Sequence, residues 1–108
     1  MIDNRFPKPM VDFAEIQRAR ERIRGVAVRT PLIEFKLCEA DPRRLFLKPE
    51  NLQPIGAFTL RGAYNKIASL SPEDRERGVI TYSSGNHGQG VAYAARALGT
   101  KAVIVMPN

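Results

Sequence analysis

The chain has 108 residues, of which 44% are hydrophobic and 26% charged; this is a globular composition and excludes a disordered or fibrous protein. The net charge of +6 is spread evenly, with eleven Lys and Arg against eight Asp and Glu in residues 1–50, and six against three in 51–108. Because no basic patch is interleaved with aromatic residues, the charge predicts no nucleic-acid partner.

The first quarter of the chain is predicted to hold an irregular arm and one helix. Residues 1–10 contain two prolines and read as the arm. The stretch "DFAEIQRARERIRG" (12–25) has apolar residues at helical spacing. Asp12 and Glu15 stand at capping-box positions, and Gly25 provides the stop.

Short strands are expected at "VAV" (26–28) and "LFLK" (45–48), with "TPLIEF" (30–35) extended around its proline. A second helix is expected from Gly56 to about Leu70. "SPED" (71–74) opens a further helical turn, with serine as cap and proline at the first helical position.

The last third of the sequence predicts a strand "GVITY" (78–82), a turn "SSGNHGQG" (83–90), a helix "VAYAARALG" (91–99) and a strand "KAVIVM" (101–106). Strand, helix and strand at this spacing form a βαβ unit, so the fold class is α/β with a parallel sheet. The final strand is strictly apolar, which is typical of strands buried on both faces. Since so small a sheet does not cover itself, we expect the beginning of a longer protein.

The turn at 83–90 follows a parallel strand and precedes a helix, where open α/β sheets bind ligands. The amides of such a helix start suit a carboxylate or phosphate. The glycine spacing is not that of a dinucleotide-binding loop, and the only histidine, His87, excludes a multi-histidine metal site. Local chemistry leaves open whether this is an anion site or an ordinary glycine-rich turn.

The stretch "PIGAFTLRGAYN" (54–65) reads as a tight turn into a helix. On local chemistry alone, Phe58 is expected in the core and Thr59 as an exposed or capping hydroxyl.

Together, "RTPLI", "LKPENLQPIGAF", "RGAYNKI", "SSGNHGQGVAYAA" and "AVIVMP" resemble the N-terminal part of the threonine dehydratase and serine racemase family. These are fold-type-II enzymes that depend on pyridoxal phosphate. The family pattern G-S-F-K-x-R-G-A carries the lysine that forms an imine with the cofactor. Here the lysine position holds Thr59 and the serine before Phe58 is replaced by Ala57, so the resemblance implies that covalent attachment is lost.

The resemblance also implies roles for other residues. Phe58 and Asn86 would lie against the cofactor. The loop that holds the substrate carboxylate would consist of Ser83, Ser84, Gly85, Asn86 and His87. Ser84 matches the acid/base serine of the family's racemases, whereas its dehydratases often have alanine there.

By resemblance, the parent reaction converts L-threonine or L-serine to a 2-oxo acid and ammonia, and this chain is expected to be inactive because of Thr59 and its short length. One alternative is an amino-acid racemase of the same family. Another is a non-catalytic relative that keeps the fold for binding. Residues 1–50 would pack on a large domain whose remainder is absent, and residues 51–108 would begin the small domain.

The expected partner is a small hydroxy amino acid, and the family implies a homo-oligomer for the full-length form. With a single cysteine, Cys38, no intrachain disulfide can form, which fits a reducing compartment. The apolar runs are too short to span a bilayer, and the N-terminus has no hydrophobic leader. The sequence predicts a soluble cytoplasmic protein.

Overall fold

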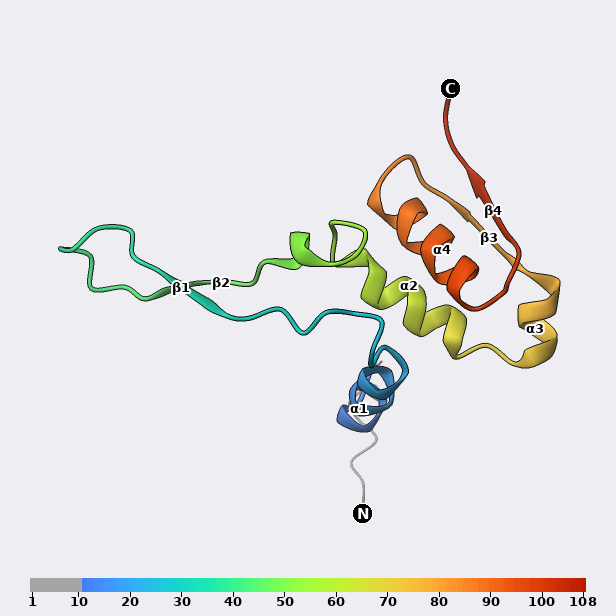
Figure 1. The fold of residues 1–108 in the computed structure, drawn as a ribbon, viewed down its shortest axis with the longest axis horizontal. Helices are drawn as coiled ribbons and strands as arrows, with labels where there is room; N and C mark the ends of the chain where they lie inside the picture. Colours follow the sequence, from blue (N-terminus) through green and yellow to red (C-terminus); the bar gives the residue numbers. More distant parts are fainter. Residues whose placement is uncertain (1–10) are drawn as a thin grey trace, which may run out of the picture.

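The computed structural model describes residues 11–108, and the arm expected over residues 1–10 lies outside them. The elements in chain order are α1 (Phe13–Arg22), β1 (Ile33–Phe35), β2 (Leu45–Leu47), a 3-10 turn (Glu50–Leu52), α2 (Thr59–Ala68), α3 (Pro72–Arg77), β3 (Val79–Tyr82), α4 (Asn86–Ala97) and β4 (Ala102–Val105). The Cα radius of gyration is 18.0 Å, against about 13 Å for a compact domain of this length. The described residues are therefore extended, as Figure 1 shows.

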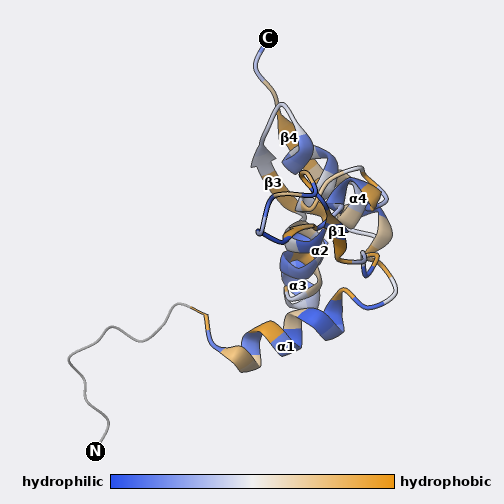
Figure 2. Ribbon diagram, turned by 90° about the vertical axis from the view of Figure 1, so that its left-hand side faces the viewer, coloured by the Kyte–Doolittle hydropathy of each residue, from blue (hydrophilic) through white to orange (hydrophobic). Residues whose placement is uncertain are grey.

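Helix α1 confirms the predicted capping box. The Asp12 side chain accepts from the amide of Glu15, whose carboxylate accepts from the amide of Asp12. Gly25 follows the helix with φ +78°. No residue of α1 is buried, and Phe13 is 72% exposed. Figure 2 shows that α1 carries hydrophobic residues toward its start and hydrophilic ones toward its end.

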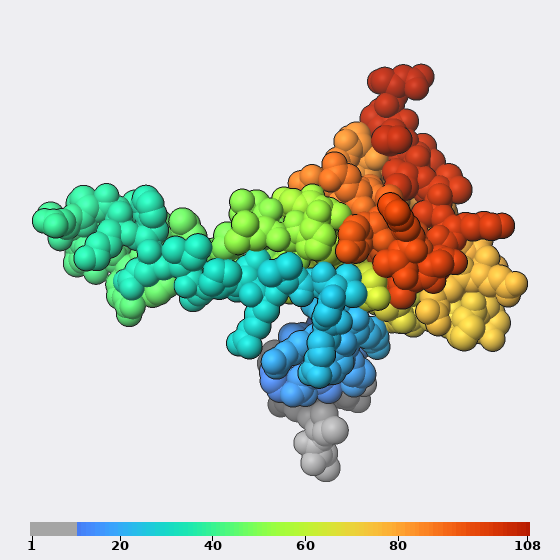
Figure 3. All heavy atoms as spheres, in the orientation of Figure 1, coloured from blue at the N-terminus to red at the C-terminus, as the bar shows by residue number. Residues whose placement is uncertain are grey.

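Strands β1 and β2 pair antiparallel, with Ile33 opposite Leu47, and form a hairpin that projects away from the rest of the chain (Figures 1 and 3). The strand expected at 26–28 is wrong. Its last residue, Val28, instead pairs with a side chain: its N–H donates to Gln53 Oε1 (2.9 Å) and its carbonyl accepts from Gln53 Nε2 (2.8 Å). An amide side chain thus takes the place of a neighbouring strand.

The βαβ unit is confirmed: β3 and β4 pair in parallel, with Val79 opposite Ala102. The turn expected over 83–90 is shorter than predicted, because α4 already begins at Asn86. Two glycines inside its first turns, Gly88 and Gly90, are buried. A methyl group on Gly90 would lie 3.2 Å from Thr59 O, so glycine is needed where α4 crosses α2.

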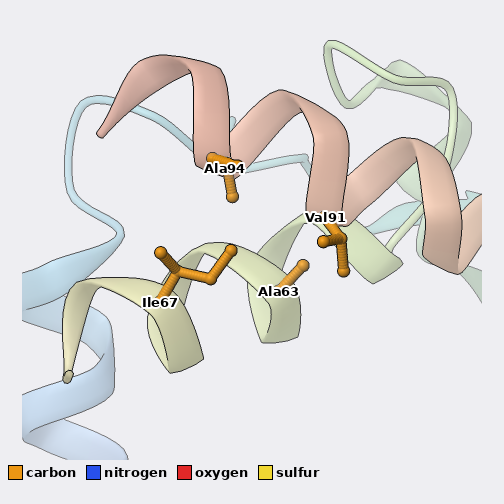
Figure 4. Close-up of a cluster of buried hydrophobic side chains, with 5 residues drawn as sticks. Ala63, Ile67, Val91 and Ala94 are labelled. Carbon is orange, nitrogen blue, oxygen red and sulfur yellow. The ribbon is translucent and has the colours of Figure 1, made fainter. Parts of the chain in front are cut away.

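The core lies between α2 and α4, where Figure 4 shows the side chains of Ala63 and Ile67 facing those of Val91 and Ala94. All four are at most 6% exposed. Small residues dominate this contact, so the two helix backbones approach closely. That approach brings the first turns of both helices together.

The sheet face away from α4 is exposed. Ile80 and Tyr82 on β3 are 74% and 85% exposed, and Val103 and Val105 on β4 are 57% and 53% exposed. Figure 2 shows the hydrophobic colour of β4. Burial of this strand on both faces, expected from its apolar sequence, does not occur among the described residues. Within residues 11–108, no helix combines the length and the hydropathy needed to cross a membrane.

Candidate functional site

The two motifs singled out in the sequence meet at the helix starts. Thr59 is the first residue of α2, and its hydroxyl donates to the backbone carbonyl of Asn86, the first residue of α4, over 2.9 Å. The bond joins residues that lie 27 positions apart in the sequence. The helix expected from Gly56 starts three residues later, because Gly56 has φ +71° and belongs to the preceding turn.

Phe58 precedes α2 as its N-cap residue and is 66% exposed. Its expected place in the core is therefore wrong, and its ring is free to contact a ligand. Gly85 and Asn86 are exposed, and the backbone carbonyl of Asn86 accepts the hydrogen bond from Thr59.

Ser83 organises the turn into α4. Its Oγ accepts from the amides of Gly85 (3.2 Å) and Gly88 (3.0 Å), so two amides of this turn are engaged by the loop itself. Ser84 is exposed. Because the first amides of a helix lack intrahelical partners, those of Asn86 and His87 are the ones suited to an anion.

His87 lies within hydrogen-bond distance of β3: its Nε2 is 3.1 Å from Thr81 Oγ1. Both side chains, with Thr59, line an open cavity of about 730 Å³ between α2, α3, β3 and α4. Its walls are mainly apolar, and include Ala63, Ile67, Leu70, Val79, Ile80 and Val91. The cavity places one imidazole and two hydroxyls beside apolar surface.

A polar network that sequence reasoning missed lies behind the start of α2. Arg61 donates from Nε to Glu50 Oε2 (2.7 Å), and from Nη2 to Glu50 Oε1 (2.9 Å) and Val28 O (2.8 Å). Glu50 also accepts from Thr30 Oγ1 (2.7 Å) and Gln53 Nε2 (3.2 Å). These residues come from three separate segments with no periodic spacing, so local sequence patterns do not predict that their side chains meet.

The Arg61 guanidinium, through its hydrogen bonds, is the main cause that lowers the pKa of Glu50 from 4.5 to about 2; Thr30 and Gln53 add to this effect, while burial opposes it. A carboxyl whose pKa is lower in the folded than in the unfolded chain stabilises the fold above the unfolded pKa. That stability is lost as the pH falls through the folded pKa. For Glu50 the loss begins below about pH 5 and amounts to roughly 2–3 kcal/mol.

We therefore expect the free energy of unfolding to fall between about pH 5 and pH 2, and the Glu50→Gln variant to show a much shallower fall. Urea titrations at pH 7, 5, 4 and 3 measure this. Glu34→Gln is the matched control, because Glu34 pairs with Arg44 on the exposed hairpin. Equal pH profiles for Glu50→Gln and the unchanged chain would contradict the assignment.

The described residues do not fit a covalently tethered pyridoxal phosphate. Thr59 has no amine, and its hydroxyl is held by the carbonyl of Asn86. Among the residues that line the cavity the only lysine is Lys66, two turns further along α2. Within residues 11–108, no group of three or more His, Cys, Asp or Glu side chains is placed to hold a metal ion.

The comparisons with known proteins agree on one family. Residues 23–108 match the family model described as "Pyridoxal-phosphate dependent enzyme". The chain is 48% identical over 100 residues to the L-threonine ammonia-lyase of Thermotoga maritima, a match that covers 92% of this chain and 25% of that protein.

Solved structures give the same result. Maize serine racemase is similar with a TM-score of 0.84 and 42% identity, over 90% of this chain and 31% of the other. The processed form of threonine deaminase isoform 2 from Solanum lycopersicum has a TM-score of 0.75 and 40% identity, over 90% of this chain and 28% of the other. The chain thus spans about a quarter to a third of the length of the relatives it matches.

Proposed function

The chain belongs to the pyridoxal-phosphate dependent enzyme family, within its threonine dehydratase and serine racemase group, and on this premise we propose that it derives from a hydroxy-amino-acid ammonia-lyase. The parent reaction would convert L-threonine or L-serine to a 2-oxo acid and ammonia. The observation that carries the proposal is the contact between the starts of α2 and α4, where the side chain at position 59 bonds to the backbone carbonyl of Asn86. This chain, with Thr59 in that position, would be inactive.

The proposed substrate site is the start of α4. The amides of Asn86 and His87 would bind the amino-acid carboxylate, and Ser83 would keep the loop in shape through its bonds to Gly85 and Gly88. The exposed ring of Phe58 and the side chain of Asn86 would contact the pyridoxal phosphate ring. When bound, that group withdraws electrons from the substrate.

The test uses a hybrid enzyme, in which residues 1–108 replace the matching segment of the Thermotoga L-threonine ammonia-lyase. With Thr59→Lys, the hybrid is expected to release ammonia from L-threonine or L-serine, measured by a coupled ammonia assay. The control is a second hybrid that carries the matching segment of another active relative. The proposal would be contradicted if the control releases ammonia while the first hybrid binds neither amino acid and stays inactive.

Racemisation is the first alternative, and Ser84 favours it because this hydroxyl is exposed at the loop that would bind substrate. In the Thr59→Lys hybrid, Ser84→Ala is expected to lower racemisation by roughly 10²–10⁴-fold, the contribution of one positioned acid or base. Ammonia release is expected to change much less. Chiral chromatography of serine and the ammonia assay measure the two rates. An equal loss in both rates would show that Ser84 has no specific role in racemisation.

A second candidate function is non-catalytic binding. It is favoured by the Thr59 hydroxyl, which is committed to a structural hydrogen bond. In that case the hybrid with Thr59 would bind a hydroxy amino acid in calorimetry without converting it.

The domain assignment and cellular context are part of the same proposal. Residues 1–50 would pack on a large domain, and residues 51–108 would begin the small one. The exposed hairpin and the exposed sheet face support this, because both offer apolar surface for further contacts. We also propose a homo-oligomeric whole protein in the cytoplasm, where a single free cysteine, Cys38, is compatible with the reducing conditions.

A further inference from the structure

The start of α2 lacks the side-chain cap that fixes the starts of α1 and α3. Helices α1 and α3 begin with side-chain caps, from Asp12 and Ser71 respectively. The residue before α2, Phe58, has helical dihedral angles and no side-chain cap bond. A helix start without a cap frays or shifts at little cost. The turn at Gly56 ends before α2, and contacts from other segments can then hold the first turn of the helix in place.

Arg61 supplies that constraint from within the first turn of α2. Its planar guanidinium makes three hydrogen bonds, two of them to the carboxylate of Glu50 and one to the carbonyl of Val28. The Glu50 side chain is 18% exposed and that of Arg61 32% exposed. The two bonds to Glu50 fix the orientation as well as the position of Arg61.

The acceptors of Arg61 are themselves held. Thr30 and Gln53, each 3% exposed, both donate to Glu50. Gln53 also bonds the N–H and the carbonyl of Val28. The segments that carry Val28 and Glu50 thus form one braced unit, against which α2 is placed.

The contacts of Thr59 leave little freedom for that placement. Its hydroxyl reaches Asn86 O at 2.9 Å. Its backbone carbonyl lies so close to α4 that a methyl group on Gly90 would be 3.2 Å away. A shift of the first turn of α2 by about 1 Å away from α4 would stretch the bond from Thr59 to Asn86 beyond hydrogen-bond distance.

The structure assigns to Arg61 and Glu50 the role of positioning residues, which set the first turn of α2 and so determine how the side chain at position 59 reaches the start of α4. The pair acts through position 59, although Arg61 also lines the cavity beside Thr59. The inference goes beyond the proposed reaction and does not depend on it, since it is tested in the chain as it stands, without cofactor or substrate.

The test is a double-mutant cycle with Thr59→Val, which removes the hydroxyl and keeps the shape. In the unchanged chain this substitution is expected to lower the ratio of folded to unfolded molecules about fivefold, the usual effect of losing one hydrogen bond. In the Glu50→Gln background the expected effect is less than twofold, because Thr59 would already have lost its contact. In the control background Glu34→Gln the effect stays about fivefold.

Nuclear magnetic resonance provides the readout that a merely stabilising pair would not change. In 15N-labelled folded chain, Glu50→Gln is expected to shift the amide signals of Asn86 and His87, far along the sequence from the substitution, and Glu34→Gln is not. Arg61→Lys keeps the positive charge but loses the paired N–H groups that bond the Glu50 carboxylate. It should reproduce these shifts, and it replaces Glu50→Gln in the test if that variant does not fold.

A smaller effect of Thr59→Val in the Glu50→Gln background, together with shifted amide signals of Asn86 and His87, supports the assignment. A fivefold effect in every background with unmoved amides would overturn it and leave Arg61 and Glu50 as a stabilising ion pair. A Thr59→Val substitution that changes nothing in the unchanged chain would also overturn it, by removing the contact that the pair is said to set.

Discussion

Replacing Thr59 by lysine in the hybrid enzyme is expected to raise ammonia release by at least about 10²–10⁴-fold, the contribution of a positioned acid or base alone. The reason is chemical. A lysine offers a primary amine that can bond covalently to an aldehyde and move a proton near neutral pH, whereas a hydroxyl does neither usefully. The change also frees the carbonyl of Asn86, which now accepts from Thr59.

Two measurements check this result. Ammonia release gives the rate, and the intact mass after borohydride reduction shows whether the coenzyme is attached covalently. The matched control is Thr59→Met, which has similar length but no amine. We expect attachment and turnover with lysine, and neither with threonine or methionine. Covalent coenzyme at position 59 in the unchanged chain, or family-like activity with Thr59, would refute the interpretation.

Substitution of Gly90 by alanine is expected to destabilise the chain by about 1–3 kcal/mol, the usual cost of adding a methyl group to a filled contact. The new Cβ would lie 3.2 Å from Thr59 O and 3.3 Å from both Thr59 C and Ala63 Cβ. These neighbours belong to the backbone and to a buried alanine of α2, so they cannot rotate away. Urea unfolding followed by circular dichroism measures the loss.

Gly62→Ala is the control, and its expected effect has the opposite sign. Gly62 lies inside α2, and an added Cβ there meets nothing within 4 Å. Alanine in a helix interior is then favoured by about 0.5–1 kcal/mol over glycine. Similar effects of the two substitutions would mean that α4 does not approach α2 as closely as the structure has it.

Local sequence determined most of the secondary structure. The caps at Asp12 and Ser71 and the alternation from strand to helix to strand after Gly78 depend on near neighbours, and the structure confirms them. The family was also readable from the sequence, because its motifs occur in order across most of the chain, and the match over residues 23–108 confirms it.

Long-range contacts decided what local rules predicted wrongly. Val28 was expected in a strand, but the amide of Gln53 satisfies its backbone groups. The helix α4 begins earlier than its glycines suggest, and two of these glycines lie where an added side chain would meet neighbours: Gly90 against Thr59 and Ala63, and Gly88 against Ile104 and Ser83. Phe58 is exposed although its side chain is hydrophobic, because the backbone turn at Gly56 sets the direction in which it points.

For the candidate site, the sequence by itself determined that position 59 holds a hydroxyl where the family has an amine, since this is a matter of residue identity. Only the tertiary structure decided what that hydroxyl does. Its bond to Asn86, and the Arg61–Glu50 pair behind it, join segments 27 and 11 residues apart. Such contacts depend on how segments distant in the sequence pack against each other, and local sequence does not specify which side chains then meet.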